Sequence, residues 1–389
     1  MEIFPGLTMR DVQLFCNIPP LQGAGLVDAE RLNKAARRYY RSIRRIGGPW
    51  VAGFDIGLSS EVSATYLLEW FHNRLGFGFQ DRVGGAIMFA GLVWQVEMEF
   101  DGVKERRDYG LIFNAIKSLY IDPDGNNQVT SWYTNDASIA EYGRRELIIP
   151  LDGVSATVAQ TKCQSELTKT AYPAAEAIAI GSKNTADSVT VTATGLAFTA
   201  NNRYVTAGDG SEVDVSAYVQ DIVETDCDFL RAGYIQENTL QVVSGFNQPM
   251  RAWDALVELA ELGDGTRPFV IYVDGNGYVN YHQADNAPKY EWRGRVGGGL
   301  RNRLGAHSPW QMQPGVVRNL TRPSSAPPPG SFLADGRDIW IAEIEMRDDA
   351  DAPTMKPDGF DPAAIAAAVE QNKRWLEEAA ANGEAVVNL

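Results

Sequence analysis

Apolar and polar positions alternate most clearly in residues 90–149, and this stretch predicts an antiparallel sheet. From Gly91 to Phe100 one face carries Leu92, Trp94, Val96, Met98 and Phe100, while Val93, Gln95, Glu97 and Glu99 fall on the other. A period of two predicts a strand with one buried face. Asp101-Gly102 then predicts the tight turn of a hairpin, because this pair adopts the positive φ angles that such turns need.

The residues that follow predict more strands and a short helical corner. Ile116–Tyr120 and Val129–Tyr133 are apolar runs on either side of the turn residues Asp122–Asn127. Asp136 or Ser138 is expected to cap a short helix, with Glu141 three residues after Ser138 and Gly143 as its end. These polar residues have roles in turns and caps, so none of them is left as a catalytic candidate.

Helical and strand patterns alternate in the rest of the chain. Helices are predicted for residues 28–46, from Ser59 or Ser60 to Leu75, Ser155–Thr170, Val213–Val223 and Arg251–Leu262. Strands are predicted for Trp50–Ile56, Ser188–Ala193, Gly195–Tyr204, Phe269–Val273, Tyr278–Tyr281, Val316–Thr321 and Ile339–Ile344. Arg293–Arg303 and Asp348–Gly359 are expected as loop and linker, and a last helix is expected to start at Asp361. The pattern favours an α+β fold that is mainly β.

The predicted helix at residues 28–46 carries a basic stripe in an otherwise acidic chain. Its candidate partner-contact residues are Arg37, Arg38, Arg41, Arg44 and Arg45, with Leu32, Ala35, Tyr39 and Ile43 on the apolar side. One interpretation is a solvated face paired with the chain's own carboxylates, which is what charge runs usually form. The alternative is a contact with an acidic neighbouring subunit. Binding of DNA ranks third.

Composition limits the classes of function. The chain has 389 residues and a net charge of −15, which argues against sequence-specific or broad nucleic-acid binding because that needs basic surface. No stretch resembles a membrane span or secretory signal, so no membrane anchor is expected. Cys16, Cys163 and Cys227 are too few and too widely spaced for a disulfide framework or a metal site, and indicate synthesis in a reducing compartment.

A search for chemistry finds no convincing site. The histidines are His72, His282 and His307, without a second metal-ligating residue at a useful spacing, and His72 is expected to be a core or boundary residue. Asp122–Asn126 resembles a calcium loop only superficially, since Gly125 is fourth and Tyr133 twelfth. Glu97 with Glu99, and Glu343 with Glu345, could pair two carboxylates on one strand face as a glycosidase requires. We therefore expect no enzyme, and no catalytic, cofactor-binding or metal-binding residue.

Several stretches together resemble a known family. They are Gly91–Trp94, Asn114–Tyr120, Thr130–Glu146, Gly195–Tyr204, Asp214–Ser216 and Ala252–Asp264. These stretches resemble bacteriophage tail-hub or baseplate-hub proteins, the family that also forms the base of contractile-injection spikes. The resemblance implies a ring-forming structural protein, usually a homotrimer, that closes the distal end of the tail tube around the DNA passage. It also implies barrel-like tube domains and no enzymatic role.

The resemblance and the patterns together predict an organisation and a set of partners. Antiparallel β-barrel tube-like domains with peripheral helices are expected: a first barrel-type tube domain with helices at 50–175 and a second β-rich domain with helix 251–262 at 176–300, after an N-terminal arm and basic helix at 1–49. Strands returning around a Pro-rich loop are expected at 301–347, and a linker and C-terminal helix at 348–389. The implied partners are further copies of the chain, the tail tube, the distal tail ring, the tape measure and a spike or fibre. The implied location is the virion tail, assembled in the host cytoplasm.

Three alternatives remain open from the sequence. A distal tail ring protein, usually a hexamer, would fit the same patterns. A tail-associated peptidoglycan or glycan hydrolase would use two of the four paired glutamates, although residues 348–389 are too short for the fused hydrolase of some hub proteins. A carbohydrate-binding adhesin is suggested by 9 Trp and 15 Tyr, most of which fall on predicted buried faces.

Overall fold

The structure is a computed structural model that describes residues 12–17, 30–181, 187–246, 248–267 and 269–284, and five later strand segments, 288–293, 299–302, 316–319, 339–347 and 354–357. As predicted, the fold is α+β and mainly β. The expected C-terminal helix, the Pro-rich loop, His307 and most of the N-terminal arm lie outside the described residues. Within the described part, no helix has the length and apolarity needed to cross a membrane.

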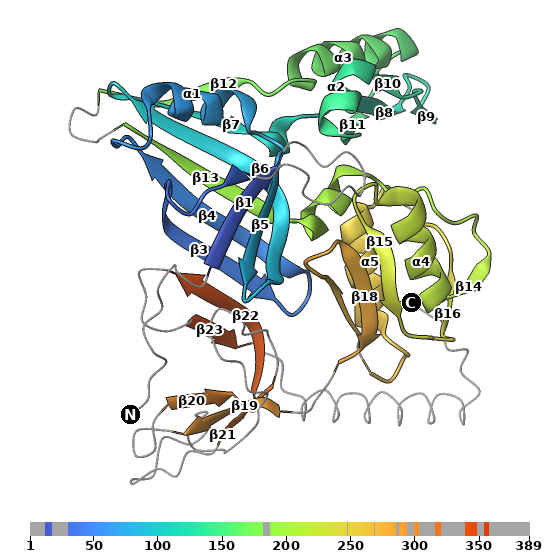
Figure 1. Cartoon of the computed structure of the whole chain (residues 1–389). Coiled ribbons are helices and arrows are strands. Elements are labelled where there is room, and N and C mark those ends of the chain that lie inside the picture. Colours follow the sequence, from blue (N-terminus) through green and yellow to red (C-terminus); the bar gives the residue numbers. More distant parts are fainter. Residues whose placement is uncertain are drawn as a thin grey trace, which may run out of the picture.

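A large curved sheet organises the chain (Figure 1). Its central path runs β2-β1-β5-β6-β13-β4-β3-β22-β21-β19-β20, with β7, β12 and β23 joined at the side. The strands are β1 (Val12–Asn17), β2 (Glu30–Arg31), β3 (Ala36–Arg44), β4 (Gly48–Gly57), β5 (Gly78–Val83), β6 (Ala86–Phe100), β7 (Val103–Asp108), β12 (Ala175–Ile180), β13 (Ser188–Gly195), β19 (Pro288–Arg293), β20 (Gly299–Asn302), β21 (Val316–Asn319), β22 (Ile339–Arg347) and β23 (Thr354–Pro357). The path has two ends, so the described strands do not form the closed barrel that was expected.

The predicted hairpin at the centre of this sheet is confirmed, and its strand is longer than the pattern indicated. β6 starts at Ala86, and Asp101 and Gly102 close the turn to β7 with φ angles of 48° and 78°. Two segments expected as irregular also contain strands: β20 lies in the expected loop 293–303, and β23 in the expected linker 348–359. Both predictions were wrong because short edge strands carry little pattern of their own.

The predicted helix at residues 28–46 is wrong, because these residues form β2, a turn and β3. Ala36, Tyr39, Arg41 and Ile43 are the buried positions of β3 that point into the core. A bulge between Arg37 and Tyr40, with Arg38 at φ 53°, shifts the alternation by one residue. The resulting spacing of three and then two residues, preceded by buried Leu32, resembles the period of a helix.

One face of the large sheet encloses the first hydrophobic core. Helix α1 (Ala64–Asn73) packs on it with Leu67, Trp70 and Phe71, and the Trp70 ring meets Phe54 of β4 edge-on at 5.7 Å. The N-cap is Ser63 rather than the expected Ser59 or Ser60. Strands that are distant in sequence, from Val12 to Met346, contribute to this core.

A second unit with its own core contains residues 196–283. Its elements are η3 (Leu196–Asn202), β14 (Glu212–Asp214), α4 (Val215–Asp226), β15 (Arg231–Ile235), β16 (Gln241–Val243), α5 (Ala252–Leu262), β17 (Phe269–Val273) and β18 (Tyr278–Gln283). The two predicted helices and the β17–β18 hairpin are confirmed. The strand expected at Gly195–Tyr204 is instead a 3-10 helix, in which Ala197 and Ala200 pack into this core.

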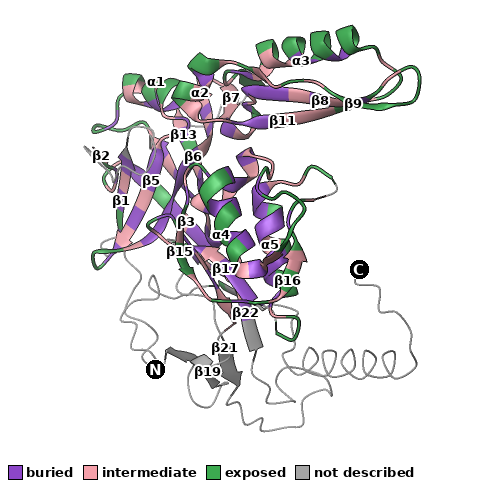
Figure 2. Cartoon of the chain, turned by 90° about the vertical axis from the view of Figure 1, so that its right-hand side faces the viewer, coloured by how far each residue is buried: buried purple, intermediate pink, exposed green. Residues whose placement is uncertain are grey.

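A third unit is inserted between β7 and β12. It contains η2 (Tyr109–Leu111), β8 (Ala115–Ile121), β9 (Asn127–Val129), β10 (Tyr133–Thr134), α2 (Asp136–Tyr142), β11 (Glu146–Leu151) and α3 (Ala156–Thr170). Figure 2 shows that most of α3 is exposed at the top of the molecule. Asn135, not Asp136 or Ser138, caps α2, since its side chain accepts from the Ser138 N–H at 3.0 Å. Ser138 is buried, and its hydroxyl donates to the carbonyl of Ala171.

Candidate assembly surface

The outward face of the large sheet, which we call the polar face, carries side chains of both charges and extends across β12, β7, β6, β13, β4, β3 and β22. Arg106 of β7 bonds Glu176 of β12 at 2.7 Å, and Lys104 bonds Glu97 of β6 at the same distance. These residues lie on one face because directly paired positions of adjacent antiparallel strands point the same way, as Glu97 and Arg106 do. The result is a row of intramolecular ion pairs that leaves no strong excess of either charge.

The row continues on the other half of the sheet. Thr190 of β13 donates to Asp55 of β4 at 2.8 Å, and Asp55 pairs with Arg38 of β3 at 2.7 Å. Tyr40 lies over Gly53, where a Cβ atom would come within 2.6 Å of its ring. Burial raises the pKa of Tyr40, so its hydroxyl stays protonated at neutral pH.

The four glutamates considered as catalytic pairs belong to this polar face. Glu343 pairs with Arg44 at 3.3 Å and Lys356 at 3.5 Å, and Glu345 pairs with Lys356 at 3.6 Å. Glu97 accepts from Gln95 at 2.8 Å besides its bond to Lys104. Glu97, Glu343 and Glu345 are therefore engaged in ion pairs between neighbouring strands, and in the described part of the chain none of them faces a pocket where a sugar could bind between two carboxyl groups.

The structure separates the five arginines that the sequence grouped together. Arg37 and Arg38 are exposed, and Arg44 is half-buried, with its guanidinium carbon 4.2 Å from the centre of the Trp50 ring. Arg45 is also half-buried. Arg41 is completely buried and pairs with Asp81, so it cannot reach a partner protein. The sequence missed this difference because strand neighbours alternate between two faces whereas a helix would place these residues on one side.

A polar and aromatic junction fixes the inserted unit against the second unit. Glu146, only 2% exposed, lies 2.7 Å from the Nε of Arg144 and 3.5 Å from that of Arg203. Its other oxygen accepts from the backbone N–H of Tyr204 at 3.0 Å, and its carbonyl accepts from Arg251 at 2.8 Å. A carboxylate with this many donors strongly favours one arrangement of the two units.

Arg145, the neighbour of Glu146, joins the inserted unit to the large sheet. Its buried guanidinium lies 4.1 Å from the centre of the Tyr109 ring and 5.1 Å from that of Trp94 on β6. Its Nε donates to the carbonyl of Ile112 at 2.8 Å. Burial raises the pKa of Tyr109 and lowers that of Arg145. Arg145 and Glu146, at the start of β11, therefore hold all three units together, and no local sequence pattern indicates this.

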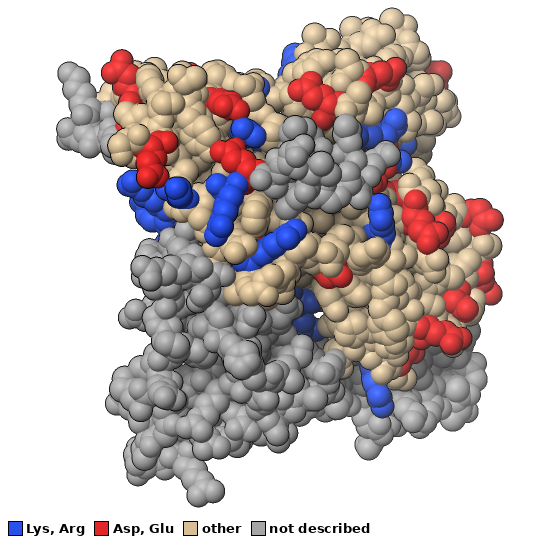
Figure 3. Space-filling view, in the orientation of Figure 1, with Lys and Arg blue, Asp and Glu red and all other residues tan. Residues whose placement is uncertain are grey.

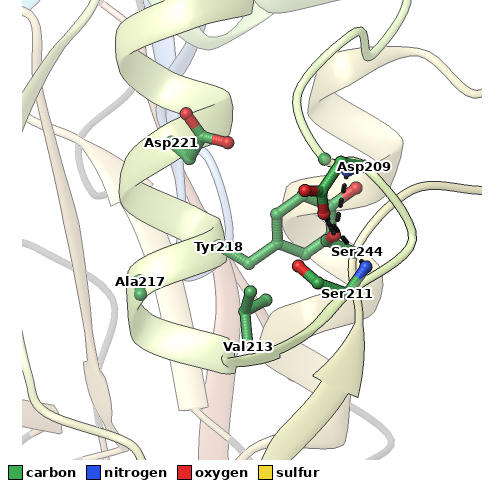
Figure 4. A pocket seen from close by; sticks show the side chains of 8 residues that line it. Asp209, Ser211, Val213, Ala217, Tyr218, Asp221 and Ser244 are labelled. Atoms are coloured by element: carbon green, nitrogen blue, oxygen red, sulfur yellow. Dashed lines mark hydrogen bonds between the residues drawn. The ribbon is translucent and has the colours of Figure 1, made fainter.

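A shallow pocket of about 480 Å³ lies in the second unit, and its polar groups already hold loops in place. Figure 4 shows Asp209, Ser211 and Ser244 gathered beside the Tyr218 ring, with Asp221 further along α4. Asp209 accepts a hydrogen bond from the Ser211 N–H at 3.0 Å and another from the Ser244 hydroxyl at 3.3 Å. The Ser211 and Ser244 bonds lower the pKa of Asp209, which makes it a weak general base.

Replacing Asp209 with Asn is expected to reduce the acid sensitivity of the protein. Because the folded pKa of Asp209 is lowered, its contribution to stability is complete above the unfolded pKa of about 3.9 and is lost as the pH falls through the lower folded value. Thermal unfolding followed from neutral to acidic pH should show a smaller drop in Tm for Asp209→Asn than for the wild type. Asp152→Asn, at an exposed position, is the control. Equal pH dependence of all three proteins would contradict the role given to Asp209.

The other candidate sites have structural explanations. His72 is exposed on α1, contrary to expectation, and the Nδ1 of His282 lies 2.7 Å from the carbonyl of Gln283. Asp122 accepts from the backbone N–H groups of Asp124 and Asn126 at 3.0 and 2.9 Å, as a turn residue does. Among the described residues no group of three or more His, Cys, Asp or Glu side chains is placed to hold a metal ion.

Comparison with known proteins gives structural similarities at very low sequence identity. No family model matches the sequence, and no curated protein matches it. The 43 kDa tail protein of prophage MuSo2 from Shewanella oneidensis is 7% identical, with a TM-score of 0.39 over 91% of this chain and 98% of that chain. A tail protein from Neisseria meningitidis MC58 is 8% identical, with a TM-score of 0.39 over 87% and 91%. The prophage tail protein gp18 from Listeria monocytogenes EGD-e is 8% identical, with a TM-score of 0.37 over 92% and 98%. At such scores, what this chain does has to be argued from its own residues.

Proposed function

We propose that the chain is a structural subunit of a phage tail, namely the hub that closes the distal end of the tail tube and forms a ring around the DNA passage. The family resemblance of residues 90–149 and of the later segments first suggested this role. The polar face is the observation that carries it. A broad sheet surface whose charges are neutralised within the chain suits a wall that DNA passes without adhering.

Charge distribution over the rest of the surface supports the same proposal. Figure 3 shows acidic side chains gathered at the right, over α4 and its neighbouring strands. The net charge of −15 repels a polyanion at distances shorter than the Debye length. A protein with this surface is suited to guiding DNA rather than binding it.

The junction around Glu146 also supports an architectural role. The buried Arg145 and Glu146 and the half-buried Arg203 connect three units, and such fixed connections suit a ring subunit, which has to repeat the same contacts. An enzyme with a closing lid would need a loosely held element in this place.

The proposed function includes an oligomeric state, a location and a set of neighbours. We propose a homotrimer, with a hexameric distal tail ring as the alternative, located in the virion tail and assembled in the host cytoplasm. The tail tube, distal ring, tape measure and a spike or fibre would be its neighbours. Arg37, Arg38, Arg44 and Arg45, which are all at least partly exposed, are the candidate residues for contacting the next subunit.

The mass of the purified protein in solution tests this proposal. Light scattering is expected to give about three times the 42.7 kDa of one chain, or six times for the alternative ring, with the same protein present in purified tail particles. Mass spectrometry of tails supplies the second measurement. A strict monomer that is absent from tail particles would contradict the proposal.

A further inference from the structure

The β12 strand is an exposed edge of the large sheet. It pairs with β7 on one side, and its other side pairs with no strand of the described residues. All six of its residues are exposed, including two large apolar ones, Ile178 at 43% and Ile180 at 82%. Native proteins usually protect such an edge, because its free N–H and C=O groups accept any extended segment. An edge that no described strand of the chain covers is a candidate site for pairing with another copy.

The opposite side of the sheet has a second partly open edge. β22 pairs with β3 only from Tyr40 to Arg44, so residues 36–39 of β3 pair with β4 alone among the described strands. This short segment carries the exposed Arg37 and Arg38. Arg38 is engaged with Asp55, whereas Arg37 forms no ion pair within the described part of the chain. Figure 1 shows β12 near the top of the curved sheet and β3 in its lower part.

The two edges are complementary in charge. β12 carries Glu176, whose side chain is 61% exposed although one of its oxygens bonds Arg106. The β3 segment carries cations with no acidic residue of its own between Ala36 and Arg41. An approaching β3 segment would bring Arg37 to the acidic end of β12 and cover its apolar side chains, and charge pairs across strands favour one partner and orientation.

We propose that β12 of one copy of this chain pairs with residues 36–39 of β3 in the next copy, head to tail. This inference rests on the proposed function as a ring subunit and names the interface that would build it. A contact between two different surfaces of the same chain generates a ring when the rotation closes. The polar face would then continue from subunit to subunit, because strand addition extends a sheet without reversing its faces.

Disulfide trapping in the full-length protein tests the pairing. Two variants are made, each with both changes in one chain: Arg37→Cys with Glu176→Cys, and Arg37→Cys with Ala179→Cys. The two β12 positions pair with Arg106 and Lys104 of β7, on either side of a bulge, so both lie on the polar face and cover adjacent registers there. The native Cys16, Cys163 and Cys227 are buried and should not interfere.

Mild oxidation is expected to give a ladder of cross-linked chains that ends at the ring number, three or six. The rate for at least one variant should exceed that of the control Val158→Cys with Tyr234→Cys by at least about tenfold, since a disulfide needs Cα atoms within roughly 7 Å. Both control positions are exposed and lie on α3 and β15, away from the two edges. A ladder no stronger than the control in both variants would overturn the inference.

A charge exchange provides the second test. Arg37→Glu and Glu176→Arg are each expected to reduce the assembled fraction at least about tenfold, and the double variant to restore it in part, because charge pairing at an interface depends on both partners. Single variants that assemble like the wild type would overturn the pairing.

Tail particles separate the failure of the pairing from that of the function. If the protein is present in tails as a ring but neither cysteine variant cross-links, the pairing is wrong and the proposed function stands. If it is absent from tails, the function fails, and the solution cross-linking still decides whether two copies pair. Cross-linking of β12 to a different tail protein instead of to β3 would also overturn the pairing.

Discussion

Replacing Asp81 with Ala is expected to lower the free energy of unfolding by about 3–5 kcal/mol, because it removes the buried carboxylate that pairs with the buried cation of Arg41. Arg41 Nη1 lies 2.7 Å from one oxygen of Asp81 and 2.5 Å from the other. Arg41, Asp81 and Tyr39 form a cluster in which each residue is 0% exposed. The Tyr39 hydroxyl also donates to Asp81, and burial raises the pKa of Tyr39 well above its ordinary value. Urea unfolding followed by tryptophan fluorescence measures the loss.

The matched control for Asp81 is Asp55→Ala on the polar face of the same sheet. Asp55 also pairs with an arginine at 2.7 Å, but the side chain of that arginine, Arg38, is 75% exposed. An exposed pair contributes at most about 1 kcal/mol. Combining Asp81→Leu with Arg41→Met should recover much of the stability lost in Asp81→Ala, since an apolar pair can replace a buried ion pair. Equal losses for Asp81→Ala and Asp55→Ala would contradict the buried cluster.

Replacing Gly48 with Ala is expected to destabilise the protein by at least about 2 kcal/mol through backbone strain and overpacking. Gly48 has a φ of +74°, and a Cβ atom there would come within 2.2 Å of the carbonyl oxygen of Val273. The neighbouring Gly47 exchanges backbone hydrogen bonds with Ile271 and Val273 at 2.9 and 3.3 Å. This contact joins the large sheet to the second unit, so thermal unfolding of Gly48→Ala should also show the two units separating into two transitions.

Gly57→Ala on the same strand is the control for Gly48. Gly57 has no atom within 4 Å of an added Cβ and no positive φ. Its replacement is expected to change stability by less than about 1 kcal/mol and to keep a single transition. If Gly48→Ala unfolds like Gly57→Ala, the contact between β4 and β17 does not join the two units.

Local patterns predicted the elements whose burial follows a regular period. Ser155 caps α3, Gly263 ends α5 and Asp274 begins the turn of the β17–β18 hairpin, all as expected. The helix prediction for residues 28–46 failed because a bulge at Arg38 changes the spacing of buried positions in β3. A second reason for the failed prediction is that a charged side chain, Arg41, occupies a core position. Its partner Asp81 lies 40 residues away, and no local pattern links the two.

The candidate surface could not be predicted from the sequence, because it exists only once distant strands are neighbours. Glu97, Thr190 and Asp55 become adjacent through the order β6-β13-β4, which has to be known before the polar face can be recognised. The same holds for Glu146, whose partners Arg203 and Arg251 belong to another unit. What the sequence did show was the absence of a metal or nucleophile motif and the resemblance to tail hubs.

Electron microscopy of tail particles that carry a label on this chain tests the central proposal most directly. Label is expected at the distal end of the tail tube only, on a ring of three or six copies around an open axial passage. Label along the whole tube, label on a peripheral fibre, or tails without the protein would contradict it.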